Sequence, residues 1–176
     1  AAERVKLVEL LKPLVTDNYR ELNEVKPASI IYKSNVENLS SDIETNTKLI
    51  ADKLTEVQYQ EIERGVTLVG PHRDDLILQL GDFPAKGYAS HGESWSIALS
   101  LKLATYQLLQ NDGAQPILIL DDVFAELDTV RRSRLVNLIS ANEQVIITAA
   151  VVEDIPKIPN AKIFSVTNGK VELSNG

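Results

Sequence analysis

The clearest candidate for chemistry is a pair of acids that follows a run of aliphatic residues. Ile117-Leu118-Ile119-Leu120 leads directly into Asp121-Asp122. Such a run predicts a buried strand, and the carboxyl end of a buried strand is where open α/β sheets bind ligands. In a nucleotide hydrolase, Asp121 would serve Mg²⁺ and Asp122 would orient or deprotonate the attacking water. A strand that simply ends in an Asp-Asp turn is the alternative, and these residues alone favour neither.

A second candidate is the loop Ala89-Ser90-His91-Gly92-Glu93-Ser94, which precedes a long apolar stretch. A Ser hydroxyl, a Gly that allows close backbone approach and the free N–H groups of a helix start together make an anion site. The alternative is a structural Ser N-cap with Glu93 in a favourable first turn. Because the loop is followed, one predicted helix later, by the acid pair, the order of the two motifs favours the anion site.

Three further positions each have a structural and a functional explanation. Asp128 lies just before a predicted helix, where it could be an N-cap. Thr148 ends the next predicted strand, and we expect it to be a buried strand residue. The stretch Gly70-Pro71-His72-Arg73-Asp74-Asp75 could carry acid–base chemistry or a phosphate contact, but a turn with a local ion pair is the plainer interpretation.

Hydrophobic periodicity predicts the elements that must position these residues. Residues 1–64 are expected to be mostly helical, with one helix through Leu22, a strand at 29–32 after Pro27, and a second helix capped by Ser40 or Ser41 and ending near Gly65. Later elements are strands at 66–69 and 76–80, a helix at 93–110, a strand at 116–120, a helix at 129–140, a strand at 145–148 and a hairpin around Asn168-Gly169. The strand–helix–strand unit from 116 to 148 predicts a parallel sheet, buried on both faces, and an α/β fold.

Composition limits the classes of function. The net charge of −7 argues against a broad phosphate-binding surface, because such surfaces need clustered cations. Arg131, Arg132 and Arg134 form a basic cluster that we interpret as a solvated helix face, with DNA contact as the minority alternative. The chain has no Cys and two His, which excludes disulfides and argues against zinc. With no apolar run of about 18 residues and no signal-peptide pattern, a cytoplasmic location is expected.

Three stretches, taken together, resemble the RecF family of DNA-repair ATPases, which is related to SMC and ABC heads. They are 70–75, 86–96 and 120–128, and the resemblance runs in order from about 65 to 173, with Ser-His-Gly-Glu-Ser-Trp similar to actinobacterial members. It implies the carboxy-terminal part of an ABC/SMC-type P-loop ATPase head. Residues 1–64 would form a helical lobe segment, and 65–176 a portion of the ATPase core.

The resemblance also implies a function. It is an ATP-dependent DNA-binding role in recombinational gap repair, replication restart and the SOS response, with DNA gaps or junctions, RecR, RecO and RecA as partners. Two copies would sandwich ATP and Mg²⁺. The implied ATP contacts across the dimer are Ser90, Gly92 and Glu93; the implied metal ligand is Asp121; and the implied catalytic residues are Asp122, Asp128 in the D-loop, and Thr148 at the place where related enzymes usually have a sensor His.

One departure from the family pattern limits what this chain can do. It contains no Gly-x-x-x-x-Gly-Lys-[Ser/Thr] sequence, the P-loop that cradles phosphates. We therefore expect the chain alone to be inactive as an ATPase, with exposed sheet edges and apolar surface that favour dimerisation or domain swapping. The competing hypothesis is a non-catalytic protein-interaction domain with an ABC-like surface. The Asp-Asp pair and the Gly-Pro-His-Arg stretch disfavour the tail of an ABC transporter.

Overall fold

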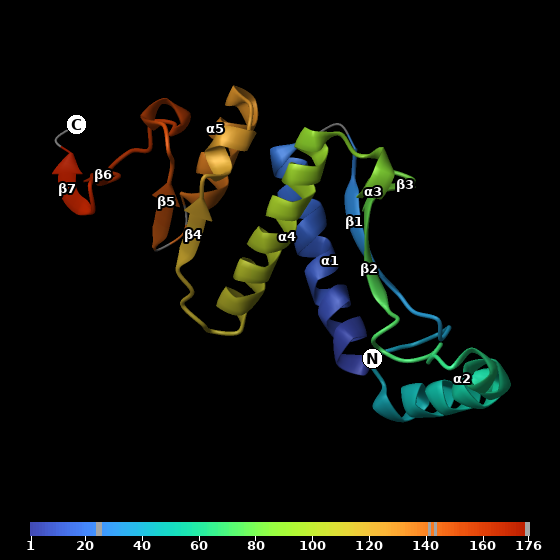
Figure 1. Cartoon of the computed structure of the whole chain (residues 1–176). Coiled ribbons are helices and arrows are strands. Elements are labelled where there is room, and N and C mark those ends of the chain that lie inside the picture. The colour runs from blue at the N-terminus through green and yellow to red at the C-terminus, as the bar shows by residue number, and fades with distance from the viewer. Residues whose placement is uncertain (24–25, 141, 143, 175–176) are drawn as a thin grey trace.

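Two long helices lie side by side at the centre of the molecule (Figure 1). The computed structural model describes residues 1–23, 26–140, 142 and 144–174. Helix α1 (Ala2–Leu22) and helix α4 (His91–Asn111) run in opposite directions, so that the end of α1 lies beside the start of α4. The predicted helices are confirmed. Pro13 lies inside α1, and Asn18 and Gln107 exchange amide hydrogen bonds of 2.9 and 3.2 Å between the two helices.

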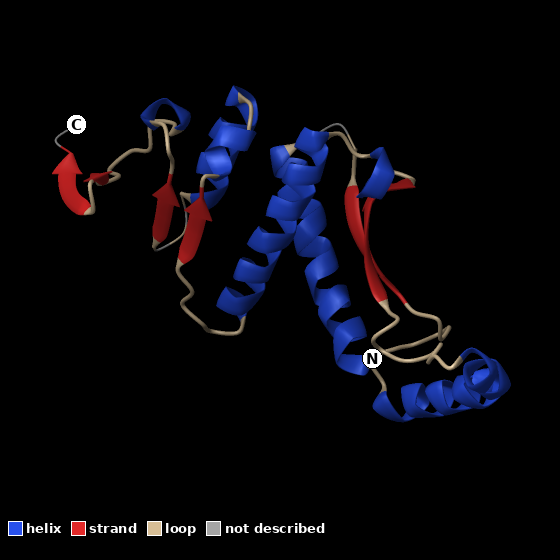
Figure 2. Cartoon of the chain, in the orientation of Figure 1, coloured by secondary structure: helices blue, strands red, loops and turns tan. Residues whose placement is uncertain are grey.

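An antiparallel sheet lies against this helix pair (Figure 2). Strand β1 (Ala28–Lys33) pairs along its full length with β2 (Asp75–Leu80), which pairs in turn with the short β3 (Phe83–Pro84). The buried side chains between sheet and helices include Tyr19, Ile30, Leu80 and Ile97. After β3 the chain forms the one-turn helix α3 (Ala85–Tyr88), which leads into α4.

Helix α2 (Ile43–Arg64) extends away from the central pair, at the lower right of Figure 1. Its N-cap is Asp42, whose carboxylate accepts from the Thr45 N–H at 2.7 Å, so the expectation of Ser40 or Ser41 was wrong. Ser40 instead exchanges two backbone hydrogen bonds with the Asn46 side chain. Helix α2 ends at Gly65, which has a φ of 63°, a left-handed conformation that glycine adopts without strain.

The strand predicted at 66–69 does not form, because side chains occupy its backbone groups. The Glu61 carboxylate accepts from the N–H groups of Leu68 and Val69 at 2.6 and 3.3 Å. The Leu68 carbonyl accepts from the Asn35 side chain at 2.8 Å. The segment is therefore a side-chain-bonded loop, and the apolar Val69 packs in a small cluster with Val36 and Val57.

A parallel two-stranded sheet carries the acid pair. Strands β4 (Leu118–Asp121) and β5 (Val145–Thr148) are joined through the short η1 helix (Val123–Glu126) and helix α5 (Thr129–Ile139), which confirms the predicted strand–helix–strand unit. The expectation that both strands are covered on both faces was wrong. Leu118 and Leu120 face the core, whereas Ile119 is 62% exposed and Ile146 is 43% exposed on the other face.

The chain finishes as the predicted hairpin. After the short η2 helix (Val152–Asp154), strand β6 (Ile163–Thr167) pairs antiparallel with β7 (Lys170–Ser174). Asn168 and Gly169 have φ values of 51° and 75°, as a type I′ turn requires. Every residue of both strands is exposed, so the hairpin packs against none of the cores.

The proposed division at residue 64 does not separate two packed bodies. Across it, β1 pairs with β2 and α1 packs on α4. The division into a helical lobe segment and an ATPase core portion therefore stays a proposal. Within the described ranges, no helix combines the length and apolarity needed to cross a membrane.

Candidate functional site

The predicted site residues lie at the ends of elements that point toward the same side of the molecule. Strands β4 and β5 end there, and helices α4 and α5 begin there, at the top of Figure 1. Parallel pairing places Asp121 directly opposite Thr148. The strand ends carry carboxylates and a hydroxyl, which suit a cation, and the start of α4 carries a hydroxyl and backbone N–H groups, which suit a phosphate.

Thr148 holds the acid pair in position. Its hydroxyl donates to Oδ1 of Asp121 and accepts from the N–H of Asp122 at 3.3 Å, while its carbonyl accepts from the same N–H at 3.1 Å. Asp122 has a φ of 54°, a left-handed conformation that Asp tolerates better than most residues. Both acids are exposed, and so is Thr148, contrary to the expectation of a buried strand residue.

The loop before α4 forms a complete capping box. The Ser90 hydroxyl accepts from the Glu93 N–H at 3.3 Å, and Oε2 of Glu93 accepts from the Ser90 N–H at 2.8 Å. The other carboxylate oxygen, Oε1, accepts from Nζ of Lys26 at 2.9 Å. The bond from Lys26, together with those from Ser90, lowers the pKa of Glu93 from 4.5 to about 2. The structural alternative foreseen for this loop is thus present, and Glu93 is fully engaged within the chain.

Gly92 allows an arginine to lie against the start of α4. A Cβ at this position would come within 2.8 Å of Nη1 of Arg131. That guanidinium is paired with Oδ2 of Asp128 at 2.9 Å, and Oδ1 of Asp128 accepts from the Arg131 N–H at 2.9 Å. Asp128 is therefore the N-cap of α5, and Arg131 connects it with the Ser90–Glu93 loop.

A second contact between the two motifs involves residues that the sequence did not single out for it. Nε2 of His91 lies 3.1 Å from Oε2 of Glu126, and both side chains are exposed. The His91 ring also makes an edge contact with Trp95, at a centroid distance of 6.5 Å. His91 and Glu126 are far apart in sequence, and only their inclusion in the two family-like stretches could have indicated that they meet.

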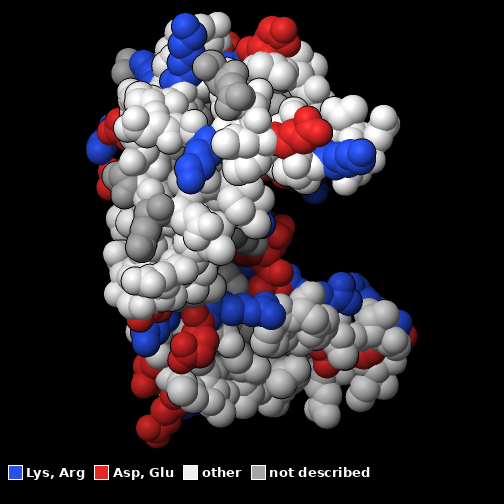
Figure 3. All heavy atoms as spheres, turned by 90° about the vertical axis from the view of Figure 1, so that its left-hand side faces the viewer, with Lys and Arg blue, Asp and Glu red and all other residues white. Residues whose placement is uncertain are grey.

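The basic cluster on α5 is not the solvated face that we expected. Arg131 pairs with Asp128, and Arg132 pairs with Asp154 at 2.9 Å while donating to the Leu127 carbonyl at 2.8 Å. These two side chains are only 24% and 22% exposed. On the face shown in Figure 3, acidic and basic side chains are interspersed rather than gathered into one basic patch.

The Gly70–Asp75 stretch is a turn, as the plainer interpretation held, but without the expected ion pair. The Arg73 guanidinium donates twice to the Thr67 carbonyl, at 2.9 and 2.6 Å. Nε2 of His72 lies 2.8 Å from the Thr67 hydroxyl, and Asp74 accepts from the Tyr32 hydroxyl. The turn lies near the amino terminus of α1, where Arg4 donates to the Pro71 carbonyl, and not at the edge with the acid pair.

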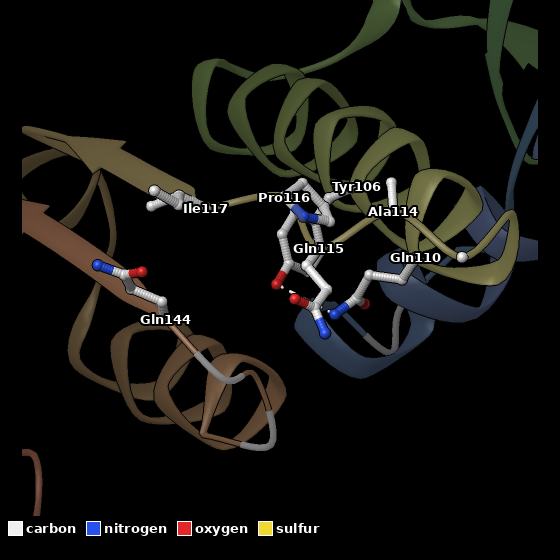
Figure 4. Close-up of a pocket in the computed structure, with 8 residues that line it drawn as sticks. Tyr106, Gln110, Ala114, Gln115, Pro116, Ile117 and Gln144 are labelled. Atoms are coloured by element: carbon white, nitrogen blue, oxygen red, sulfur yellow. Dashed lines mark hydrogen bonds between the residues drawn. The ribbon is translucent and has the colours of Figure 1, made fainter.

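Neither a ready metal cluster nor the cavity described below coincides with the acid pair. Among the residues that the structure describes, no three His, Cys, Asp or Glu side chains are placed to hold a metal ion. A cavity of about 680 Å³ lies at the opposite end of α4 and β4 (Figure 4), and its lining includes Tyr106, Gln110, Gln115 and Gln144. Asp121 thus offers a single carboxylate, which fits Mg²⁺ when phosphates and waters complete the shell.

Sequence comparison shows which proteins the chain is similar to. No protein-family model matches the chain. It is 48% identical over 172 residues to the DNA replication and repair protein RecF of Streptomyces avermitilis, and 46% identical over 192 residues to that of Beutenbergia cavernae. Each match covers 97% of this chain. The chain is RecF-like. It spans about half the length of the curated relatives it matches, 46% and 48% respectively.

Solved structures show the same relationship for the fold. The recombination mediator protein RecF-ATPrS in the RecFOR pathway superposes with a TM-score of 0.75 at 25% identity, covering 98% of this chain and 46% of that one. A structure from work on ATP-driven dimerization of SMC ATPases gives a TM-score of 0.54 at 14% identity, and covers 98% of this chain and 86% of that one. The expected fold, part of an ABC/SMC-type ATPase head, is confirmed.

Proposed function

We propose that this RecF-like chain supplies the signature loop and the Walker B acids of an ATPase that acts in DNA replication and repair. One observation carries the proposal: the Ser90–Glu93 loop contacts the segment that follows the acid pair, His91 with Glu126 and Gly92 with Arg131, in a chain that is 48% identical to RecF of Streptomyces avermitilis over 172 residues. The finer roles that we propose are recombinational gap repair, replication restart and the SOS response in the cytoplasm. The proposed partners are gapped or junction DNA, RecR, RecO, RecA and a second copy of the protein.

The geometry supports a division of labour among the site residues. Ser90 and Gly92 would face the γ-phosphate of ATP held by the second copy, where a helix start stabilises negative charge. Glu93, whose two oxygens are already bonded within the chain, would act as a positioning residue that holds the loop. Direct contact between this carboxylate and a phosphate would also bring two negative charges together.

The acid pair would serve the cation and the water. Asp121 would hold Mg²⁺ through a direct or water-mediated contact, with Thr148 orienting its carboxylate. Asp122 would orient the attacking water, and its backbone is fixed by the two bonds to Thr148. Asp128 would present the D-loop to the second copy while capping α5. Thr148 would be a positioning residue in place of a sensor His.

A reconstitution experiment tests the proposal. The chain would be co-expressed with the amino-terminal half of Streptomyces avermitilis RecF, which would contribute the P-loop, and ATP hydrolysis would be measured with and without gapped DNA. We expect hydrolysis that Asp121→Asn and Ser90→Arg each abolish, while Glu63→Gln, an exposed position on α2, leaves it unchanged. A purified complex that binds ATP but hydrolyses it equally with Asp121→Asn would refute the assignment of the acid.

The alternative is a non-catalytic protein-interaction domain, and the exposed apolar face of β4 and β5 is the observation that favours it. Under this alternative the chain would bind a protein partner tightly without nucleotide, and the reconstituted pair would show no hydrolysis above that of the RecF half alone. The same co-expression therefore separates the two hypotheses.

A further inference from the structure

One edge of strand β2 is open, and the chain itself explains why. On one side β2 pairs with β1 over all of Asp75–Leu80. On the other side, within the described part of the chain, β3 pairs only with Gln79 and Leu80. Strand β3 stops at Pro84, and the chain then turns away from β2 into α3. Residues 75–78 are therefore left without a neighbouring strand.

The direction of the backbone groups follows from one hydrogen bond. The Gly81 N–H donates to the Pro27 carbonyl at 2.8 Å, so the backbone groups of residue 81 point toward β1. Because these groups alternate along a strand, those of Leu80, Leu78 and Leu76 point to the other edge. Leu80 meets Phe83 there. The groups of Leu78 and Leu76 face the open side.

The chain protects this edge at one point. The Leu76 N–H donates to Oδ1 of Asp75 at 2.8 Å. A charged side chain on an edge strand is one of the devices by which proteins prevent unwanted strand pairing. Asp75 leaves the N–H and carbonyl of Leu78 and the carbonyl of Leu76 available, which makes the protection partial.

A groove runs along the open edge. Its volume is about 540 Å³, and its lining includes the four consecutive residues Asp75, Leu76, Ile77 and Leu78. Successive side chains of a strand point to opposite faces, so four consecutive residues line one groove only when it follows the strand edge itself. The far wall comes from α3 and the start of α4, and contains Pro84, Ala85, Lys86, Ala89, Ser94 and Ile97.

We propose that this groove binds an extended segment of a protein partner, which adds to the sheet beside β2. A strand in this groove would form main-chain hydrogen bonds with Leu76 and Leu78 and place an apolar side chain against Ala89. Running antiparallel to β2, in line with β3, it would begin beside Lys86. An acidic residue at its amino-terminal end would complement that cation.

The test uses a capped, fluorescein-labelled hexapeptide, Glu-Val-Thr-Val-Thr-Val, and the chain of 176 residues. Binding is followed by anisotropy, and its location by backbone amide shifts. Two N-methylated forms serve as a matched pair, one methylated at the alternate amides that face β2 and the other at the amides that face solvent. We expect saturable binding with shifts at residues 76–78, lost in the first form and retained in the second.

A pair of variants tests for tighter rather than weaker peptide binding. Asp75→Ala frees the Leu76 N–H and should tighten peptide binding about fivefold, the change expected for one added main-chain hydrogen bond. Asp82→Ala removes the same charge from the exposed turn beyond β2 and should leave binding unchanged.

Three results would overturn the proposal. Equal binding of both methylated peptides would show that main-chain pairing plays no part. Peptide shifts on the exposed face of β4 and β5, or none at 76–78, would place the ligand elsewhere. Concentration-dependent self-association through residues 76–78 without peptide would assign the edge to a second copy. Because the methylation comparison uses the unaltered chain, it decides the matter even if Asp75→Ala fails to fold.

Discussion

The ion pair between Lys26 and Glu93 should make the stability of this chain depend on pH in a defined window. The pKa of Glu93 is lowered from 4.5 to about 2, first by the bond from Lys26 and then by the two bonds from Ser90. A carboxyl whose pKa is lower in the folded state than in the unfolded chain stabilises the fold above the unfolded pKa. The contribution should be complete above about pH 4.5 and disappear as the pH falls toward about 2.

The size of the effect follows from the geometry. Without screening, a shift of this size would correspond to about 3 kcal/mol. The Glu93 side chain is 15% exposed but its Lys26 partner is 49% exposed, so solvent weakens their attraction. We therefore expect Glu93→Gln to reduce the free energy of unfolding at pH 7 by about 1 to 2 kcal/mol. Gln can still complete a capping box, so the substitution removes mainly the charge.

Urea unfolding followed by fluorescence is a suitable assay, because the single Trp of the chain, Trp95, lies two residues from Glu93 on the same helix turn. The midpoint for Glu93→Gln should fall by roughly 0.5 to 1 M urea at pH 7. The difference between the two proteins, rather than either curve alone, is the diagnostic quantity, because other carboxyls titrate over the same range. Lys26→Gln is the matched control, and the double variant should lose little more than either single one.

A flat difference between pH 7 and pH 2.5 would refute this reasoning, since the stabilisation would then be independent of the charge on Glu93. A full additive loss in the double variant would refute it as well, because the two side chains would then act on stability through separate partners.

Substitutions at three other positions test separate features. Gly92→Ala should fold with stability within about 1 kcal/mol of the parent, because only the flexible end of Arg131 must move, and a crystal structure should show that guanidinium displaced. Asp122→Gly should raise the unfolding free energy by about 1 kcal/mol by relieving a φ of 54°, whereas Asp122→Val should lower it, as measured by urea titration. Phe124→Ala, at a fully buried position in the core beside β4, should lower it by about 3 to 5 kcal/mol, visible as a large fall in melting temperature.

Sequence patterns correctly predicted the elements that depend mainly on interactions between residues close together in the sequence. The α1 and α4 periodicities, the Asn168-Gly169 turn and the strand–helix–strand unit around α5 each depend on neighbouring residues, and each forms where the sequence indicated. The segment 66–69 has the composition of a strand but lacks a partner, because Glu61 and Asn35 take its backbone groups first. These bonds come from residues outside the segment, so the local sequence of residues 66–69 could not predict that the strand fails to form.

In the candidate site, too, the residues themselves could be proposed from the sequence, whereas the contacts between distant residues could not. The types and order of its residues were sufficient to propose the Ser90–Glu93 loop and the acid pair as site residues. The contacts that join them, from Lys26 to Glu93, from His91 to Glu126 and from Arg131 toward Gly92, depend on how α1, α4 and α5 pack. The exposure of Ile119 agrees with the expectation that a chain without the P-loop exposes apolar surface, but the aliphatic run alone did not indicate which of its residues would be uncovered.

Helix α4 is packed on three sides, and this packing restricts how the Ser90–Glu93 loop at its start can move. Its buried residues belong to three separate cores: Leu99 and Leu103 pack toward β4, Ile97 toward the antiparallel sheet, and Ala104 against α1. Rolling the helix about its own axis would pull all three cores open at once, whereas a small slide along that axis disturbs each of them less. If a second molecule pushes on Ser90–Glu93, we therefore expect α4 to shift along its own axis. Such a shift would move its other end, at Asn111, relative to the cavity beside it, whose lining has no charged residue.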